Sequence, residues 1–312
     1  MKLLVTGGCG FIGSNFIKHV LDKEQLDSIL NIDSLSYAGS LSNTAAFETH
    51  KKYKFKNVDI FFPNQVSDAF RRFKATHVVH FAAETHVDNS IKCSLKFLET
   101  NINGTHNLIK SSLASGVKRF HHVSTDEVFG SLGEKGKFKE TTPYDPRNPY
   151  SASKAASDHL VRAFHHTHGL PITISNCSNN YGPNQHKEKF IPTILNSLKK
   201  GNKIPVYGNG SNVRDWIYVE DHCDAIWKIL TNGKNGETYN VGSNCEKTNL
   251  EVIEEICTAL KLEPSACIEF VKDRAGHDLR YAIDSRKIKK ELNWKPSHSF
   301  KSGIKKTIAY YA

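Results

Sequence analysis

Short apolar runs alternate with longer amphipathic stretches through the first half of the chain. Such alternation is typical of parallel strands that are buried on both faces and joined by helices. The pattern predicts strands at Lys2–Thr6, Ser28–Asp33, Asn57–Ile60, His77–Ala82, Arg119–Ser124 and Ile172–Cys177. It predicts helices near Phe11–Asp22, Gln65–Phe73, Cys93–Ser115 and Tyr150–His168. With right-handed crossovers, these elements form an α/β fold with a doubly wound parallel sheet.

The pattern becomes irregular after Cys177, where prolines and glycines divide the chain into short segments. Short strands at Asp215–Val219 and Thr238–Val241 flank a helix at Asp221–Leu230 and can return to the first sheet. A chain of 312 residues is long enough for two domains. We expect one domain of residues 1–178 plus about 214–242, and a smaller, interleaved α/β domain of residues 179–213 plus about 243–312.

Composition narrows the class of protein. Hydrophobic residues make up 38% of the chain and charged residues 24%, which is typical of a soluble globular protein. The apolar run after Met1 is too short for a signal peptide, and no run approaches the roughly 18 residues of a membrane-spanning helix. The seven cysteines are scattered and form no C-x-x-C pair, so reduced thiols are expected rather than disulfides or a zinc site. These features predict a cytoplasmic protein with no membrane partner.

The net charge of +10 is compatible with a polyanion partner or with a basic surface. The Lys51–Lys56 run alternates lysines with aromatic residues, and we expect it to be a solvated strand. Most of the excess charge is therefore expected to be solvated surface that steers anionic substrates, and no nucleic-acid partner is predicted. Three histidines, His165, His166 and His168, lie at an expected helix end without a carboxylate or cysteine to complete a site, so no metal is predicted.

A glycine-rich turn follows the first expected strand. The sequence GGCGFIG at residues 7–13 places a G-x-G-x-x-G motif between a strand and a helix. In that context glycines let the backbone approach a pyrophosphate, and the helix N-terminus supplies N–H donors. The second strand ends at Asp33, where a carboxylate accepts hydrogen bonds from ribose hydroxyls and repels a 2′-phosphate. A Rossmann-type domain that binds NAD rather than NADP is predicted.

Tyr150 and Lys154 are four residues apart at the start of an expected helix, so both project from one face. A lysine ammonium near a phenol stabilises the phenolate and lowers the pKa of the tyrosine toward the range of a general base. Ser124 and Thr125 end the preceding strand, where a hydroxyl can hold a substrate alcohol against that tyrosine. The combination predicts oxidation or reduction of an alcohol.

Six segments resemble the extended short-chain dehydrogenase/reductase family, and within it the nucleotide-sugar 4,6-dehydratases. The segments span essentially the whole chain and are GGCGFIGS (7–14), STDEVFG (124–130), YSASK (150–154), NCSNNYGP (176–183), RDWIYVED (214–221) and DRAGHDLRYAID (273–284). The pair Asp126 and Glu127 favours the dehydratases, because epimerases of this family carry small residues there and the decarboxylases lack the aspartate.

The resemblance implies a reaction on dTDP-glucose, or alternatively on UDP-glucose, with NAD as cofactor. On this hypothesis Tyr150 takes the proton of the C4 hydroxyl, Lys154 tunes Tyr150, and Thr125 hydrogen-bonds the O4 oxygen. Glu127 then abstracts the C5 proton, and protonated Asp126 donates to the departing water. Return of the hydride to C6 gives a 4-keto-6-deoxy sugar nucleotide.

The resemblance also implies the residues that contact the two ligands. Cofactor contacts are expected from Gly7, Gly10, Phe11, Ile12, Gly13, Asp33, Ser34, Leu35, Ser36, Asp59, Ile60, Phe81, Ala82, Ala83, Thr85, Thr100, Tyr150, Lys154, Cys177 and Asn180. Substrate contacts are expected from Thr85, Thr125, Asn179, Lys189, Phe190, Pro205, Val206, Tyr207, Arg214, Asn249, Arg274 and His277. A pyrophosphate needs Arg and Lys donors, and a pyrimidine needs an aromatic or apolar slot.

Two alternatives stay open from the sequence. One is a UDP-sugar enzyme of the same fold, either a 4,6-dehydratase or a C4 epimerase, and the other is a non-catalytic NAD-binding regulator. The regulator is disfavoured because Thr125, Tyr150 and Lys154 are all present. The family further implies a homodimer formed through a four-helix bundle of the helices at Cys93–Ser115 and Tyr150–His168.

Overall fold

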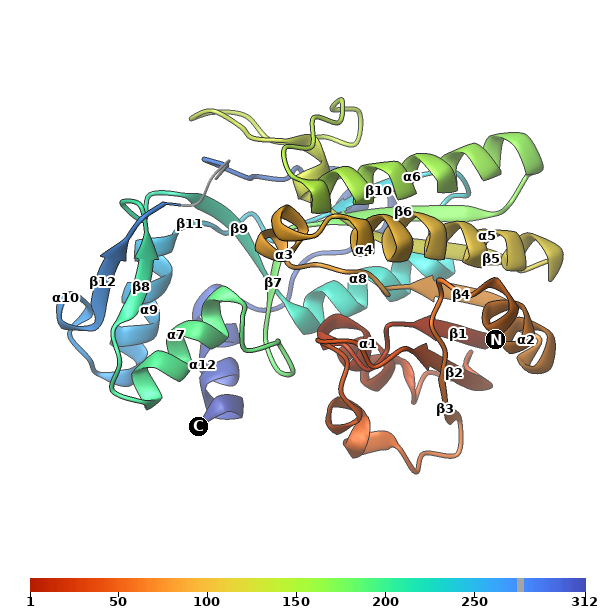
Figure 1. Cartoon of the computed structure of the whole chain (residues 1–312), viewed down its shortest axis with the longest axis horizontal. Helices are drawn as coiled ribbons and strands as arrows, with labels where there is room; N and C mark the ends of the chain where they lie inside the picture. Colours follow the sequence, from red (N-terminus) through yellow and green to blue (C-terminus); the bar gives the residue numbers. More distant parts are fainter. Residues whose placement is uncertain (274–277) are drawn as a thin grey trace.

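The computed structural model describes residues 1–273 and 278–312, and it confirms the α/β class with a doubly wound sheet. Seven parallel strands form the large sheet in the order β10-β6-β5-β4-β1-β2-β3 (Figure 1). In chain order they are β1 Lys2–Thr6, β2 Ser28–Asp33, β3 Tyr53–Asn57, β4 His77–His80, β5 Arg119–Thr125, β6 Ile172–Cys177 and β10 Thr238–Val241. The chain order reverses between β1 and β4, which is where doubly wound sheets open a crevice for ligands.

Helices cover both faces of this sheet. They are α1 Phe11–Val20, α2 Pro63–Phe73, α3 Val87–Lys92, α4 Leu95–Phe97, α5 Thr105–Ala114, α6 Pro149–His168 and α8 Val219–Asn232. Three shorter helical segments are η1 Leu41–Phe47, the π-helical η2 Leu98–Gly104 and η3 Asp126–Phe129. Alternate residues of a strand point to opposite faces. Leu3 and Val5 accordingly pack with α1 and α8, whereas Leu4 packs with α2 and α5.

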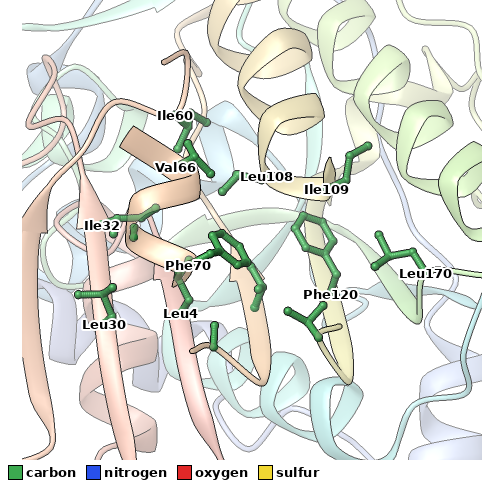
Figure 2. Packing of buried hydrophobic residues seen from close by; sticks show 14 of the residues in the cluster. Leu4, Leu30, Ile32, Ile60, Val66, Phe70, Leu108, Ile109, Phe120 and Leu170 are labelled. Carbon is green, nitrogen blue, oxygen red and sulfur yellow. The ribbon is translucent and has the colours of Figure 1, made fainter. Parts of the chain in front are cut away.

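Figure 2 shows the core on the α2 and α5 side, where Phe70 and Phe120 lie among aliphatic side chains. Both of these rings are almost fully buried, as are Leu108 and Ile109 of α5. A core packed on both faces holds the strand ends in fixed positions, and this gives the residues that follow each strand a rigid support.

The third strand lies earlier than the sequence pattern indicates. The predicted Asn57–Ile60 strand is wrong, because β3 runs over Tyr53–Asn57 and pairs with β2 from Ile29 onward. Val58 and Ile60 are buried, but they lie in the loop that leads to α2, so their apolar character reflects packing rather than pairing. β3 is an edge strand, and the lysines of the 51–56 run suit such a partly solvated position.

The remaining elements form two small sheets and the helices around them. β7 Asn179–Tyr181, β9 Val213–Tyr218 and β11 Glu246–Thr248 form one sheet, and β8 Ile204–Tyr207 with β12 Ile268–Val271 forms the other. The helices here are α7 Phe190–Lys199, α9 Asn249–Leu260, α10 Pro264–Cys267, α11 Arg286–Leu292 and α12 Phe300–Tyr311. β10 therefore returns to the large sheet, whereas β9 pairs with β7 and β11. The exact domain boundaries stay a prediction.

Among residues 1–273 and 278–312, none of the helices combines the length and the apolar character that are needed to cross a bilayer.

Candidate active site

The carboxyl ends of β1, β4, β5 and β6 open into a cleft of about 450 Å³. The cleft is lined by 19 of the 20 expected cofactor residues; Leu35 is the exception. The Leu35 backbone N–H instead donates to Asp33 Oδ1 at 2.8 Å, so this residue supports the site from behind. Thr125, Asp126, Glu127, Tyr150 and Lys154 line the same cleft. Motifs far apart in the sequence thus meet at one edge of the sheet.

The glycine turn has room only for glycine. Gly7 has a φ of +71°, and a Cβ atom there would lie 2.7 Å from the Ala82 backbone nitrogen. A Cβ at Gly13 would lie 2.3 Å from the Gly7 carbonyl oxygen. Helix α1 begins at Phe11, and no side chain caps its first turn. The backbone is therefore bare at a helix N-terminus, as close contact with a dinucleotide pyrophosphate requires.

Asp33 is held in position at the end of β2. Its Oδ2 accepts a hydrogen bond from the Cys9 N–H at 2.9 Å, while Oδ1 accepts from Leu35. Burial raises the pKa of this carboxyl, and these two backbone hydrogen bonds oppose the rise. Each carboxylate oxygen has a second lone pair, so both can still accept a ribose hydroxyl. The glycine cradle and Asp33 together fit NAD.

Tyr150 and Lys154 project from the first turns of α6 toward the end of β5. The Asn148 side chain caps α6 by accepting from the Ser151 N–H at 2.9 Å, which fixes where the helix begins. Lys154 Nζ donates to the Val123 carbonyl oxygen at 2.9 Å, and Tyr150 forms a side-chain hydrogen bond with Thr125. The expected meeting of the tyrosine, the lysine and the Thr125 hydroxyl is thus present.

The pKa of Tyr150 differs from the sequence-based expectation. Burial and then the charge of Glu127 raise the pKa of Tyr150 well above its usual value, whereas the helical spacing predicts a lowered pKa. The Lys154 ammonium is engaged with the Val123 carbonyl, and burial lowers its own pKa. A lone lysine therefore does not make this phenol acidic, and a further positive charge is needed beside it.

Asp126 and Glu127 follow Thr125 directly and form the first turn of η3. Burial, followed by the charges of Glu127 and Asp215, raises the pKa of Asp126 well above its usual range. Burial also raises the pKa of Glu127, but the Arg214 and Lys189 cations oppose that rise. Asp126 Oδ2 is buried and has no hydrogen-bond partner in the described part of the chain. Asp126 is therefore biased more strongly toward its protonated form than Glu127.

The expected substrate residues divide into two groups. Thr85, Asn179 and Lys189 line the cleft along with Thr125. The expected contacts that lie outside this cleft are Phe190, Pro205, Val206, Tyr207, Arg214 and Asn249, while Arg274 and His277 are outside the described residues. Phe190 stacks on Trp216 in the core around α7 and α9, with ring centroids 6.1 Å apart.

Arg214 is already engaged by the protein. Its guanidinium lies 4.2 Å from the centre of the Tyr281 ring and donates to the carbonyl oxygens of Val213 and Asp278. Its charge also acts on both Asp126 and Glu127. Arg214 therefore lies near the two carboxyls as well as near the segment that the motif assigns to the nucleotide.

A buried polar cluster behind Lys154 was not predicted. His122 Nε2 lies 3.1 Å from Asp158 Oδ1 and 3.5 Å from Lys154 Nζ, and Asp158 Oδ2 accepts hydrogen bonds from Ser124 and Tyr144. Burial lowers the pKa of His122 to about 4, so this imidazole is neutral at neutral pH. The available signal was the helical spacing, because Asp158 follows Lys154 by four residues on α6.

Other cleft residues that were not predicted include Glu84, which pairs with Lys96 at 3.1 Å, and Glu188, which lies 3.6 Å from His86 and 3.5 Å from His186. They lie outside the contacts that the motifs imply, and nothing in their spacing singles them out.

A glycine cradle after β1, an acidic residue after β2 and a Tyr-x-x-x-Lys helix beside a threonine at the end of β5 define the class of NAD-dependent short-chain dehydrogenases/reductases. Residues 4–307 match the family described as GDP-mannose 4,6 dehydratase, and the chain belongs to this family. The family resemblance expected from the motifs is confirmed.

Individual relatives and solved structures agree with this family assignment. The chain is 48% identical to a probable dTDP-glucose 4,6-dehydratase of Sinorhizobium fredii, covering 100% of this chain and 93% of the relative. It is 46% identical to the dTDP-glucose 4,6-dehydratase of Haemophilus influenzae, covering 100% and 98%. The DesIV dTDP-glucose 4,6-dehydratase of Streptomyces venezuelae, solved with NAD bound, superposes with a TM-score of 0.96 at 42% identity, covering 100% of this chain and 97% of that one. A Thermus thermophilus UDP-glucose 4-epimerase, solved as a complex with NAD, superposes with a TM-score of 0.91 at 29% identity, covering 100% of this chain and 99% of that one.

Proposed function

We propose that the chain is an NAD-dependent dTDP-glucose 4,6-dehydratase, a hydro-lyase that converts dTDP-glucose to dTDP-4-keto-6-deoxyglucose and water. The observation that carries this proposal is the placement of Asp126 and Glu127 beside Tyr150 in one cleft. A tyrosine and a lysine suffice to oxidise an alcohol, but loss of water also needs an acid and a base. The relatives with this activity match the chain over essentially its full length.

The first step removes two hydrogens from C4 of the sugar. NAD, when bound, supplies the hydride acceptor, and its nicotinamide ring carries the positive charge that favours a phenolate nearby. Tyr150 accepts the proton of the C4 hydroxyl, and Thr125 holds the O4 oxygen against it. Lys154 adds a second positive charge on the same helix face, four residues along. The resulting ketone makes the C5 proton acidic.

The second step is the elimination across C5 and C6. Glu127 abstracts the C5 proton, because the Arg214 and Lys189 cations favour its ionised form. Asp126 donates its proton to the C6 hydroxyl as that group leaves as water, because burial keeps this carboxyl protonated. When the hydride is returned to C6, Glu127 gives its proton back to C5. Two adjacent carboxyls with different surroundings thus divide the acid and base roles.

The nucleotide-binding part of the site rests on charge and on an aromatic surface. We assign the pyrophosphate to Arg214 and Lys189 and the base to the segment around Tyr207, whereas the expected contacts Arg274 and His277 lie outside the described residues. Lys189 lines the cleft and donates to the Thr85 carbonyl oxygen at 3.0 Å, and Tyr207 is 39% exposed. A cation in the cleft suits a pyrophosphate, and an exposed aromatic ring suits a base.

Incubation of the purified protein with NAD and dTDP-glucose, in parallel with UDP-glucose, tests this function. We expect a 4-keto product, read by its absorbance in alkali, from dTDP-glucose in preference to UDP-glucose. Preference for UDP-glucose would change the nucleotide and leave the chemistry in place. Formation of a C4 epimer without 4-keto product would contradict the dehydratase, and turnover of neither sugar would contradict an enzyme of this class.

We also propose that the protein is a homodimer. Several exposed apolar side chains gather on the segment from α3 to α5, namely Ile91, Leu95, Leu98 and Leu113, and α5 packs on α6. Two helices from each copy would form a four-helix bundle and cover this surface. A cytoplasmic location stays a prediction as well, supported by seven cysteines that are all free.

Replacing Leu95, which is 61% exposed, with Asp is expected to convert the dimer to a monomer, because a charge would be buried in an apolar interface. Sedimentation velocity measures the change. Leu262→Asp is the matched control, since Leu262 is exposed but follows α9 in another part of the chain. A wild type that sediments as a monomer, or an L95D protein that remains dimeric, would contradict the proposed bundle.

A further inference from the structure

The proposed reaction does not return every catalytic group to its starting protonation state. During one turnover Tyr150 gains the proton of the C4 hydroxyl, and Asp126 loses a proton to the departing water. Glu127 gains the C5 proton and then returns it to C5, so its protonation state is unchanged at the end of the turnover. The sugar and the hydride are also balanced at the end of the turnover. The next turnover therefore requires one proton to pass from Tyr150 to Asp126.

Thr125 lies between these two groups. Its hydroxyl is in hydrogen-bond contact with Tyr150, and Thr125 Oγ1 donates to Asp126 Oδ1 at 3.4 Å. The Glu127 backbone N–H donates to the same Oγ1 at 3.3 Å, because Thr125 is the N-cap of η3. A 3.4 Å contact is long for an O–H···O hydrogen bond, but catalytic hydrogen bonds often shorten only when ligands are bound.

The Glu127 N–H fixes the direction of this short chain of hydrogen bonds. A hydroxyl has one proton to donate and two lone pairs to accept with. Since a backbone N–H can only donate, one lone pair of Thr125 is taken by Glu127. At the end of the turnover Tyr150 is protonated and its hydroxyl donates to the second lone pair, so the Thr125 proton turns from O4 to point at Asp126. The donors are therefore aligned from Tyr150 through Thr125 to Asp126.

We propose that Thr125 carries the proton from Tyr150 back to Asp126 at the end of each turnover. In this step the Tyr150 O–H bond breaks as a new bond forms at Thr125 Oγ1, while the original Thr125 O–H bond breaks and Asp126 Oδ1 gains the proton. A phenolate and a carboxylic acid replace a phenol and a carboxylate, so the net charge does not change. A half turn of the carboxyl about Cβ–Cγ then presents the acid proton where Oδ2 stood.

Burial supports an internal route. Thr125 and Tyr150 are each 8% exposed and Asp126 is 2% exposed, so exchange of these protons with water is slow when the cleft is filled. Burial also raises the pKa of both Tyr150 and Asp126, which opposes loss of their protons to solvent. A direct path of two hydrogen bonds returns the enzyme to its starting state without opening the site. The inference rests on the proposed function.

Thr125→Val tests this role, because valine keeps the shape of threonine and lacks the hydroxyl. The rate of 4-keto product formation is measured in a first turnover, with enzyme in excess, and again in the steady state with dTDP-glucose in excess. T125V slows the first turnover, since Thr125 also holds O4. We expect its steady-state rate to fall below its own first-turnover rate by a further factor of about 100, the scale of a lost proton transfer.

Two observations separate the relay from a structural role. T125S keeps a hydroxyl and should bring the two rates back together, and a small weak acid in the buffer should accelerate the steady state of T125V but not its first turnover. If T125V fails to fold, T125A provides the same comparison. Equal first-turnover and steady-state rates in the hydroxyl-free variants would overturn the relay alone. Absence of 4-keto product from the wild type would overturn the proposed function, and the relay with it.

Discussion

Asp126→Asn is expected to oxidise dTDP-glucose at C4 and then to stall before water is lost. Formation of the 4-keto-6-deoxy product should fall by about 10²–10⁴-fold, the usual contribution of a general acid. The reason is that an amide cannot supply the proton that the C6 hydroxyl needs to leave as water. Rapid-quench analysis of the sugar, combined with the absorbance of reduced cofactor, separates the two half-reactions. Full dehydratase turnover by D126N would contradict the assignment of the acid.

The wild-type pH profile follows from the same pair of carboxyls. Glu127 must be ionised, and its pKa is raised, so activity is lost as the pH falls through a value above the ordinary range of a glutamate. Asp126 must be protonated, and its pKa is raised well above the ordinary range, so activity is lost as the pH rises through that value. The two groups titrate as a coupled pair. E127Q should remove the acid limb, and a profile for E127Q that still shows it would assign that limb to another group.

Tyr150→Phe is expected to lose about 10²–10⁴-fold in the first oxidation itself, so that neither product nor reduced cofactor accumulates. The substitution removes only the hydroxyl. The ring keeps its edge contact with Phe97, with centroids 6.4 Å apart, and the residue is nearly buried, so the fold should be retained. Stopped-flow absorbance of the reduced cofactor, together with NAD affinity, measures the two properties independently.

Tyr239→Phe is the matched control for this prediction. Tyr239 is fully buried, and its hydroxyl is hydrogen-bonded to Glu291 and to the Lys234 N–H, but it does not line the cleft. Y239F should therefore lose some stability and keep its activity. Cofactor reduction by Y150F at the wild-type rate would show that another group takes the C4 proton.

Most strands of the large sheet could be predicted from the sequence, because they are continuous apolar runs. β3 is the exception, since the lysine-rich run is expected only as a solvated strand, while the buried Val58 and Ile60 in the next loop resemble a strand of the sheet. The break of the expected 93–115 helix into α4, η2 and α5 was also missed. Periodicity cannot distinguish a π-helical turn from continuous α-helix.

The site residues could be predicted where one short segment contains all the groups that act together. Residues 7–13 and 124–127 each bring their groups together through local backbone alone. Pairings such as His122 with Asp158 and Glu84 with Lys96 depend on how separate elements dock. The pKa of Tyr150 is likewise a property of burial, which the spacing of Tyr150 and Lys154 does not reveal.

Thr125, Asp126 and Glu127 are consecutive residues at the end of one central strand, so no hinge can come between them. The groups proposed to handle protons therefore move as a single body, while the residues proposed to hold the nucleotide lie in the loops and small sheets beyond Cys177. Substrate choice can change in those loops without disturbing the chemistry. Exchange of the segment around Tyr207 between relatives should consequently alter which nucleotide is accepted, and it should preserve the outcome of the reaction because Lys189 is kept beside Glu127.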